Sequence, residues 1–263
     1  MDTIIVRFYR QSLLSFKALF GFLDFKSYVI VKIINPVLQL IFFTLLAKYI
    51  YNTTDVSFWV IGNAFLLSVY NSLFGVGFVM VDERSFGTLK SVIASPANKF
   101  LVFIGRAFIH IIDGAASVIV GLLIGYLLFD VNFANTHFPM FILCILVSMF
   151  AAMGFGLLIG SFGLIVRDMN LIMNLCSFIF LLLCGAQFPI SWLPGWLQAI
   201  SNILPITRGI EASRLIVQGD ISSYVYELIA FEFIIGAIYC IIGYLLLKVL
   251  ENQARKGASL DIY

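Results

Sequence analysis

The sequence predicts an all-α membrane protein with six transmembrane helices, an N-terminal amphipathic interface helix and a re-entrant helical pair before the last span. With 62% hydrophobic and 11% charged residues and a mean hydropathy of +1.05, the composition excludes an ordinary soluble domain. A helix needs roughly 20 apolar residues to cross a membrane core of about 30 Å. Runs of that length lie near 27–50, 58–81, 100–129, 138–166, 170–189 and 224–249. No repeat or linker divides the chain, so residues 1–263 are expected to form a single membrane domain.

The positively charged residues predict the side of the membrane on which each loop lies. All but three of the 16 lysines and arginines cluster around the start of the first span, between spans two and three, between spans four and five, or at the end of span six. Cytoplasmic loops carry such an excess, so both termini and the loop after the second span are expected in the cytoplasm. The outer side would hold only Lys48, Arg208 and Arg214.

Residues 3–22 form an amphipathic segment ahead of the first span. Placed on a helix, Arg7, Arg10 and Lys17 fall on one side, and the opposite side is apolar. Such a helix lies in the membrane interface with its basic face toward anionic headgroups. It would serve either as a simple anchor or as a gate-side helix that also contacts a partner protein.

One proline and several small residues mark features within the spans. The Asn35-Pro36 pair stands in the first span, where a proline frees a carbonyl and kinks the helix. Small residues four positions apart let helices approach closely, and we interpret two such pairs as packing devices: Gly121 with Gly125, and Gly156 with Gly160.

The loop after the second span carries charges that must lie in water. It covers residues 82–98 and reads Asp82-Glu83-Arg84-Ser85-Phe86-Gly87-Thr88-Leu89-Lys90, followed by Ser95-Pro96. The segment is longer than a turn requires, and its charged side chains are suited to recognition by a soluble partner protein. Gly87 allows close backbone approach. The alternative is a solvated turn without a partner.

The stretch 190–219 is moderately apolar although the charge distribution places it on the outer side. Prolines interrupt it, Pro205 among them, and Trp196 lies on an apolar helical face. Arg208, Glu211 and Arg214 follow at i, i+3 and i+6, a spacing that permits ion pairs along a helix. Two short helices within 192–219 that dip into the outer leaflet and return fit this pattern. A surface helical pair with aromatic anchors is the alternative.

Ionisable residues inside the spans indicate either function or packing. Arg106, His110 and Asp113 recur at i, i+4 and i+7 in the third span and therefore share one helix face. They would form a functional stripe, or an interior Arg–Asp pair that fixes helix packing. Glu232 stands about two turns inside the sixth span. We expect it to face the bundle or a polar cavity, because facing lipid would cost about 2.5–3.5 kcal/mol.

Signatures of catalysis and of metal binding are missing from the sequence. It contains no Gly-x-x-x-x-Gly-Lys-Ser/Thr loop for a nucleotide and no Gly-x-Ser-x-Gly elbow for a nucleophilic serine. The two histidines form no His-x-x-x-His pair, and no cysteine–histidine cluster suggests a metal site. We therefore expect a chain that is not an enzyme, with no catalytic residue, no metal and no cofactor of its own.

Together these motifs resemble the type-2 ATP-binding-cassette (ABC) permeases, a family with multidrug or antibiotic exporters and polysaccharide exporters. The resemblance covers nearly the whole chain, in the expected order. It rests on the amphipathic N-terminus, the six spans, the Glu83…Gly87-Thr88-Leu89…Ser95-Pro96 loop and the segment Leu193-Pro194-Gly195-Trp196-Leu197…Leu204-Pro205-Ile206-Thr207…Glu211-Ala212-Ser213-Arg214. The loop is more similar to that of the drug and antibiotic exporters.

The resemblance implies a function, partners and a location. Permeases of this family dimerise and sit on two nucleotide-binding ABC ATPase subunits, so ATP and Mg would bind the partner and not this chain. The expected function is ATP-driven export of an amphipathic small molecule or peptide. The chain would be a multi-pass protein of a prokaryotic cytoplasmic (inner) membrane, paired with a second permease copy or a related permease, with no nucleic acid as partner.

The same resemblance assigns roles to residues. The segment 3–22 would be the interface helix, and the pair at 192–219 would close the outer mouth. The coupling helix at 82–98 would dock on the ATPase through Glu83, Arg84, Gly87, Thr88, Leu89, Lys90 and Pro96. Five polar residues are candidates for the lining of the translocation path: Asn35, Gln39, Tyr70, Asn71 and Asn174. Each of them could equally form a hydrogen bond to a neighbouring helix.

Two other functions remain open at this point. The same mechanism would serve the export of a lipid-linked polysaccharide or glycan, because aromatic side chains can stack on sugars. A stand-alone membrane enzyme belongs to another class of protein. It would need ordered catalytic groups inside the membrane, and it would act without an ATPase.

Overall fold

The computed structural model describes residues 34–85, 87, 99–164, 166 and 168–256, and every regular element in these ranges is a helix. The predicted all-α class is thus confirmed for the described residues. The segment 3–22, with Arg7, Arg10 and Lys17, lies outside them. The elements in chain order are α3 (Asn35–Tyr51), α4 (Ser57–Ser85), α6 (Lys99–Phe129), α7 (Phe138–Ser161), η2 (Phe162–Leu164), α8 (Met169–Leu183), η3 (Ile190–Trp192), α9 (Gly195–Ile203), α10 (Thr207–Val217) and α11 (Ser223–Lys256).

Among the described residues, four helical stretches are long and apolar enough to cross a membrane: Ser57–Val79, Phe103–Phe129, Phe138–Ser161 and Ser223–Leu250. Helices α3 and α8 are apolar but shorter, with 17 and 15 residues. At 1.5 Å per residue they measure about 25 Å and about 22 Å, against a membrane core of about 30 Å. Four of the six predicted spans therefore contain helices of spanning length, and the count of six stays a prediction.

Two helices end earlier than the hydropathy predicts. Helix α7 ends at Ser161 and α8 ends at Leu183, whereas the apolar runs continue to 166 and 189. A new helix begins after α7 because the carboxylate of Asp168 accepts a hydrogen bond from the Leu171 N–H at 3.3 Å and caps α8. Helix α8 stops where Gly185 takes a φ of +75°, a conformation that glycine adopts without strain. The intervening residues are apolar, so hydropathy alone does not mark these ends.

The first described helix begins at the proline identified in the sequence. Pro36 stands in the first turn of α3, where its missing N–H leaves no helical hydrogen bond unmade. The kink expected within the first span would fall at the border of the described residues, so it stays a prediction.

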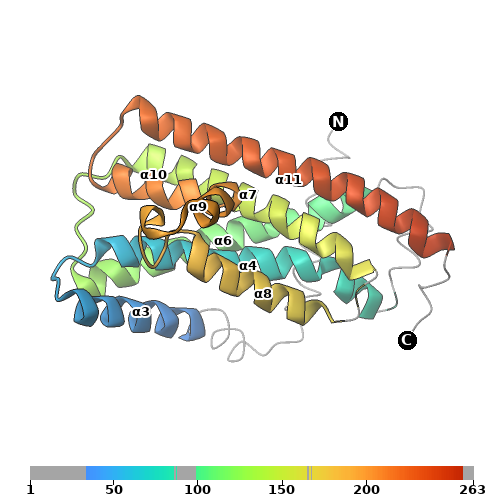
Figure 1. The fold of residues 1–263 in the computed structure, drawn as a ribbon, viewed down its shortest axis with the longest axis horizontal. Helices are drawn as coiled ribbons and strands as arrows, with labels where there is room; N and C mark the ends of the chain where they lie inside the picture. Colours follow the sequence, from blue (N-terminus) through green and yellow to red (C-terminus); the bar gives the residue numbers. More distant parts are fainter. Residues whose placement is uncertain (1–33, 86, 88–98, 165, 167, 257–263) are drawn as a thin grey trace.

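Helices α4, α6, α7 and α11 run along the long axis of the bundle, and α4 lies at its centre against α3, α6, α7 and α8 (Figure 1). The two predicted small-residue pairs both face α4. A Cβ atom would lie 2.9 Å from Ala64 if built on Gly121, 2.9 Å from Val76 if built on Gly156 and 3.1 Å from Gly77 if built on Gly160, and one on Gly125 would collide with Val60. Their predicted role in close packing is confirmed.

Helix α10 lies between α7 and α11 and runs antiparallel to both. Gly209 packs on Ser148 of α7, and one turn later Ser213 Oγ lies 3.3 Å from Cys144 Sγ. The start of α10 is deep in the bundle, because it contacts Glu232, which lies nine residues and about 14 Å along α11 from Ser223. The chain thus enters the bundle before α10 and leaves it along α10.

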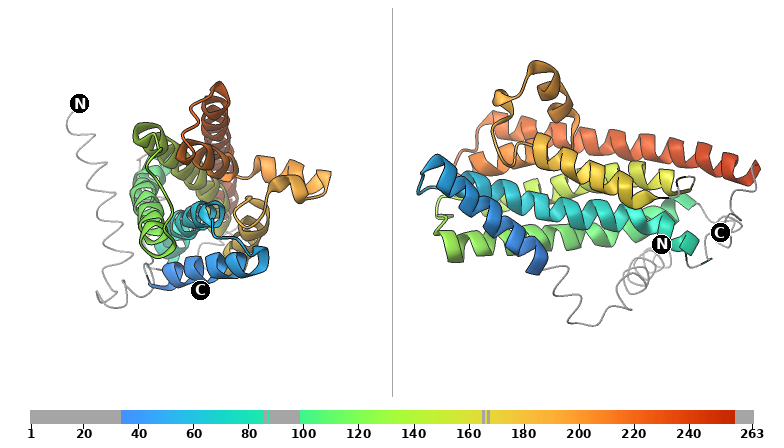
Figure 2. Two further views of the ribbon diagram at one scale, coloured as in Figure 1. Left: turned by 90° about the vertical axis from the view of Figure 1, so that its left-hand side faces the viewer. Right: turned by 60° about the horizontal axis from the view of Figure 1, so that its bottom comes forward.

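Helix α9 stands off this bundle. Figure 2 shows it projecting sideways, and its neighbours are the end of α8, η3 and α10. The predicted pair of short helices within 192–219 is therefore present, with α9 outside the bundle and α10 inside it.

Candidate functional site

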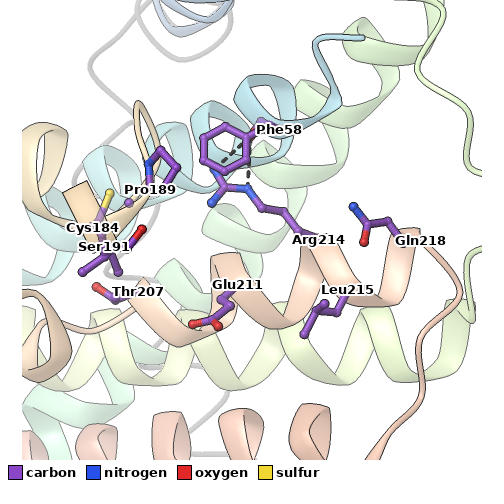
Figure 3. Close-up of a pocket in the computed structure, with 11 residues that line it drawn as sticks. Phe58, Cys184, Pro189, Ser191, Thr207, Glu211, Arg214, Leu215 and Gln218 are labelled. Atoms are coloured by element: carbon purple, nitrogen blue, oxygen red, sulfur yellow. Dashed lines mark hydrogen bonds between the residues drawn. The ribbon is translucent and has the colours of Figure 1, made fainter.

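A half-open pocket of about 330 Å³ lies at the bundle end where α4 begins and α8 ends. Phe58 at the start of α4, the segment 184–191 after α8 and one face of α10 form its walls (Figure 3). Its polar side chains are Ser191, Thr207, Glu211, Arg214 and Gln218. The sequence identified Glu211 and Arg214 as polar residues of the outer pair, but it did not predict a pocket between them and α4.

Arg214 joins the three walls of this pocket. Its Nε and Nη2 donate to the Phe58 carbonyl at 3.2 Å and 2.9 Å, and Nη2 also donates to the Ala186 carbonyl at 3.3 Å. The guanidinium carbon lies 3.4 Å from the centroid of the Phe58 ring, which adds a cation–π contact. An arginine guanidinium keeps its proton in proteins, so Arg214 brings a positive charge to this pocket.

The ion pairs that the spacing of Arg208, Glu211 and Arg214 permits are not formed within the described part of the chain. Glu211 instead accepts a hydrogen bond from the Tyr224 hydroxyl at 2.8 Å. Arg208 donates to the Asn202 carbonyl and lies over the Phe231 ring. The three side chains diverge because α10 has α4 on one side and α11 on another, and each side supplies partners.

Side-chain amides fasten the segment after α8 to α4. Gln187 Nε2 donates to Asn63 Oδ1 at 2.7 Å, and the Gln187 carbonyl accepts from Trp59 Nε1 at 2.9 Å. Beneath them, a Cβ atom on Gly62 would lie 2.6 Å from the Ala186 carbonyl oxygen. The sequence reasoning missed Asn63 and Gln187, although an amide within each of two apolar runs was a signal that could have found them.

Glu232 holds the start of α10 from the neighbouring helix α11. Its side chain is fully buried, and Oε1 accepts a hydrogen bond from the N–H of Ile206, immediately before α10. Ile206 has a φ of +68°, an unusual conformation for a β-branched residue. A carboxylate at this place meets the free N–H groups and the positive end of the helix dipole. The structure thus places Glu232 inside the bundle and gives it a capping role.

The polar stripe of α6 faces α4 in part. His110 is buried, and its imidazole fills the space that a side chain at Gly75 would need. Asp113 is half-buried on the same helix. The side chain of Arg106 lies outside the described part of the structure, so the proposed Arg–Asp pair stays a prediction.

The residues suggested as lining of a path lie on three helices. Gln39 Nε2 of α3 approaches the Tyr70 hydroxyl of α4 to 3.5 Å, at the long limit of a hydrogen bond. Asn174 is exposed on α8. The side chains of Asn35 and Asn71 lie outside the described part. The structure therefore brings together one pair from this group.

The charged segment at the opposite end begins as helix and not as loop. Helix α4 continues to Ser85, so Glu83 and Arg84 belong to its last turn. Gly87 follows with a φ of +69° and open surroundings, since a Cβ atom there would meet nothing within 4 Å. The remaining residues of the predicted coupling segment lie outside the described residues: Thr88, Leu89, Lys90 and Pro96.

The two other predicted residues of the outer pair differ in burial. Trp196 on α9 is 68% exposed, and Pro205 before α10 is buried. No cluster of histidine, cysteine and acidic side chains suited to a metal ion occurs in the ranges that the structure describes.

Comparisons with known proteins relate the chain to a transporter family. A family model described as ABC-2 type transporter matches residues 13–217. The protein named "Probable multidrug ABC transporter permease YbhR" from Escherichia coli strain K12 is 29% identical over 142 residues, which cover 53% of this chain and 38% of that protein. The protein of the same name from Escherichia coli O157:H7 matches to the same extent. The chain thus spans well under half the length of these curated relatives.

Proposed function

The chain belongs to the ABC-2 type transporter family, and on this premise we propose that it is the membrane-spanning permease subunit of an ATP-driven exporter. The observation that carries the proposal is the family match over residues 13–217, which includes every helix from α3 to α10. The apolar helices of spanning length suit a transport subunit, and the sequence has no phosphate-binding loop of its own. The energy would therefore come from ATP and Mg bound on two copies of a partner ATPase beneath a pair of permeases.

The central helix α4 supports a route for mechanical coupling. Its 29 residues extend about 43 Å, and its length includes both Phe58 at the Arg214 pocket and Glu83 at the proposed ATPase contact. Gly residues of α6 and α7 pack directly on it, and in this proposal α4 moves as a rigid rod because closely packed interiors transmit strain. In this proposal, displacement of the Glu83 end by the ATPase is transmitted along α4 to the outer pocket.

The direction and the cargo are part of the same proposal. The chain would lie in a prokaryotic cytoplasmic membrane with both termini inside, and would export an amphipathic small molecule or peptide. The naming of the similar Escherichia coli proteins as multidrug permeases supports this class of cargo. The alternative cargo is a lipid-linked glycan. A transport assay with both kinds of cargo distinguishes the two proposals.

Two glycines with open surroundings test the proposed topology. Gly87 and Gly195 lie at opposite ends of the bundle, and a Cβ atom on either would meet nothing within 4 Å. We expect the variant Gly195→Cys to react with a membrane-impermeant maleimide added to intact cells, and the variant Gly87→Cys to react only in inside-out vesicles. The native cysteines are buried or half-buried, which keeps the background low. Labelling of Gly87→Cys from outside intact cells would overturn the proposed ATPase contact.

The partner itself is tested by co-purification. We expect an ABC ATPase subunit expressed with this chain to co-purify with the wild type and to be lost with Glu83→Lys, because reversing one charge in a docking surface disfavours the complex. Transport and ATP hydrolysis should fall with it. The matched control is Glu227→Lys, which changes an exposed glutamate at the other end of the bundle and should leave co-purification intact. Transport that persists without any ATPase would instead identify a stand-alone membrane protein.

A further inference from the structure

The charge of Arg214 is met by the carboxylate of Glu211 only beyond ion-pair distance, although both residues lie on α10 and line the same pocket. Its three hydrogen bonds go to carbonyl oxygens of Phe58 and Ala186, and it forms no ion pair with the described carboxylates. These bonds use Nε and Nη2, whereas a guanidinium has five N–H donors. The two N–H groups of Nη1 make no hydrogen bond to the described residues, and Arg214 lines the pocket. Figure 3 shows the guanidinium between the Phe58 ring and the wall that carries Pro189 and Ser191.

The rest of the pocket suits a molecule with a polar head and an apolar body. Thr207 is 2% exposed, and its hydroxyl has no hydrogen-bond partner among the described residues although it lines the pocket. Ser191 adds an exposed hydroxyl at the rim. The remaining wall is apolar, with Phe58, Pro189, Ile190 and Leu215. Glu211 also lines the pocket, but its Oε1 is engaged by the Tyr224 hydroxyl of α11.

We propose that this pocket binds the anionic head, a carboxylate or a phosphate, of an amphipathic molecule. The guanidinium of Arg214 would donate to the anion through Nη1, and hydroxyls of Ser191 and Thr207 would complete its hydrogen bonds. The apolar wall would take the first part of the tail. This deepens the proposed permease function, on which it rests, by naming the class of molecule met at the outer end of the bundle. The anion would belong either to a small amphiphile in transit or to a phospholipid.

Binding of decanoate to the full chain in phosphatidylcholine nanodiscs tests the charge requirement. Decanoate has a carboxylate head, and 1-monodecanoylglycerol has the same tail with an uncharged head. We expect decanoate to bind at least about tenfold more tightly than the glycerol ester, the effect of one charge-assisted hydrogen bond. We expect Arg214→Gln to remove this preference. The control Arg208→Gln removes a positive charge from the same helix but outside the pocket, and it should keep the preference for decanoate.

A second pair of variants avoids the bonds that Arg214 makes to the backbone. Ser191 is exposed at the rim and its side chain makes no hydrogen bond in the described structure, so its replacement leaves the fold intact. Ser191→Asp adds a negative charge to the pocket, whereas Ser191→Asn introduces a side chain of nearly the same shape as aspartate without the charge. We expect the aspartate variant to weaken decanoate binding about tenfold and the asparagine variant to match the wild type.

Nanodiscs that contain phosphatidylglycerol distinguish the two sources of the anion, through the dependence of decanoate binding on this lipid. If decanoate binding weakens as the fraction of phosphatidylglycerol rises, and does so only when Arg214 is present, the natural occupant is a lipid headgroup. If decanoate binding is indifferent to that lipid, the occupant is a free amphiphile. Equal binding of decanoate and its glycerol ester, or equal binding by the wild type and Ser191→Asp, would overturn the proposal. Because no ATPase is present in the assay, such a failure leaves the permease function itself untouched.

Discussion

Replacing Glu232 with alanine is expected to lower the free energy of unfolding by about 3 kcal/mol, because a buried backbone N–H then loses its acceptor. Glu232 Oε1 is the acceptor for the Ile206 N–H, at a place that water does not reach. The change also removes a polar oxygen that faces the positive end of the helix dipole at the start of α10. The left-handed conformation of Ile206, which the carboxylate holds in place, would lose its support. Denaturant titration of the purified chain in detergent measures the loss.

Two variants make the Glu232 experiment specific. Glu232→Gln keeps an acceptor oxygen at nearly the same place, so it should lose less than half as much stability as the alanine variant. Glu227→Ala removes an exposed carboxylate five residues earlier on the same helix, and its unfolding should match the wild type within about 0.5 kcal/mol. An alanine variant at 232 as stable as the glutamine variant would show that the carboxylate does not cap α10.

The second large effect is expected from Gly62→Ala, a change of one methyl group. The new Cβ atom would lie 2.6 Å from the Ala186 carbonyl oxygen, 2.7 Å from its Cα and 2.8 Å from Arg214 Nη2. Two of these three atoms belong to the backbone, so no side-chain rotation relieves the contact. The segment after α8 would have to move off α4, at a cost of about 1–3 kcal/mol for the overpacking alone. The displacement would also lengthen the bond from Arg214 to Ala186, which adds to the loss.

The control for Gly62→Ala is the same substitution at Gly195. A Cβ atom at Gly195 would meet nothing within 4 Å, and its backbone is not in the left-handed region. Since alanine restricts the unfolded chain more than glycine does, Gly195→Ala should be neutral or stabilise by up to about 1 kcal/mol. The melting temperatures of both variants and of the wild type, measured by thermal unfolding, test this prediction. Equal melting temperatures for Gly62→Ala and the wild type would mean that the segment after α8 is not seated on α4.

The fold was predictable where the hydropathy or residue spacing within a single helix is sufficient evidence. Continuous apolar runs predicted the long helices, and the four-residue spacing of Gly121 and Gly125 predicted a close approach before the partner helix was known. The end of α8 was not predictable in this way. It depends on the backbone of Gly185 and on bonds from Gln187 to Asn63 and Trp59, which lie more than 100 residues away in the sequence.

The candidate site was predictable in its residue types but not in its contacts. Periodicity placed Arg208, Glu211 and Arg214 near one another on α10, yet it says nothing of what surrounds that helix. The partners of Arg214 are mainly backbone carbonyls, which no sequence pattern identifies. In the same way, the sequence indicated that Glu232 avoids lipid, whereas its bond to Ile206 emerges only from the tertiary packing.

The capping of α10 by α11 has a consequence for the order in which the chain is completed during synthesis. The ribosome makes Ile206 before Glu232, so the nascent chain holds the start of α10 for a time without its acceptor. Until helix α11 is inserted, the N–H of Ile206 must be satisfied by water or by the insertion machinery. The start of α10 therefore matures only after α11 has been inserted, and chains truncated before Glu232 should be recognised by quality-control proteases.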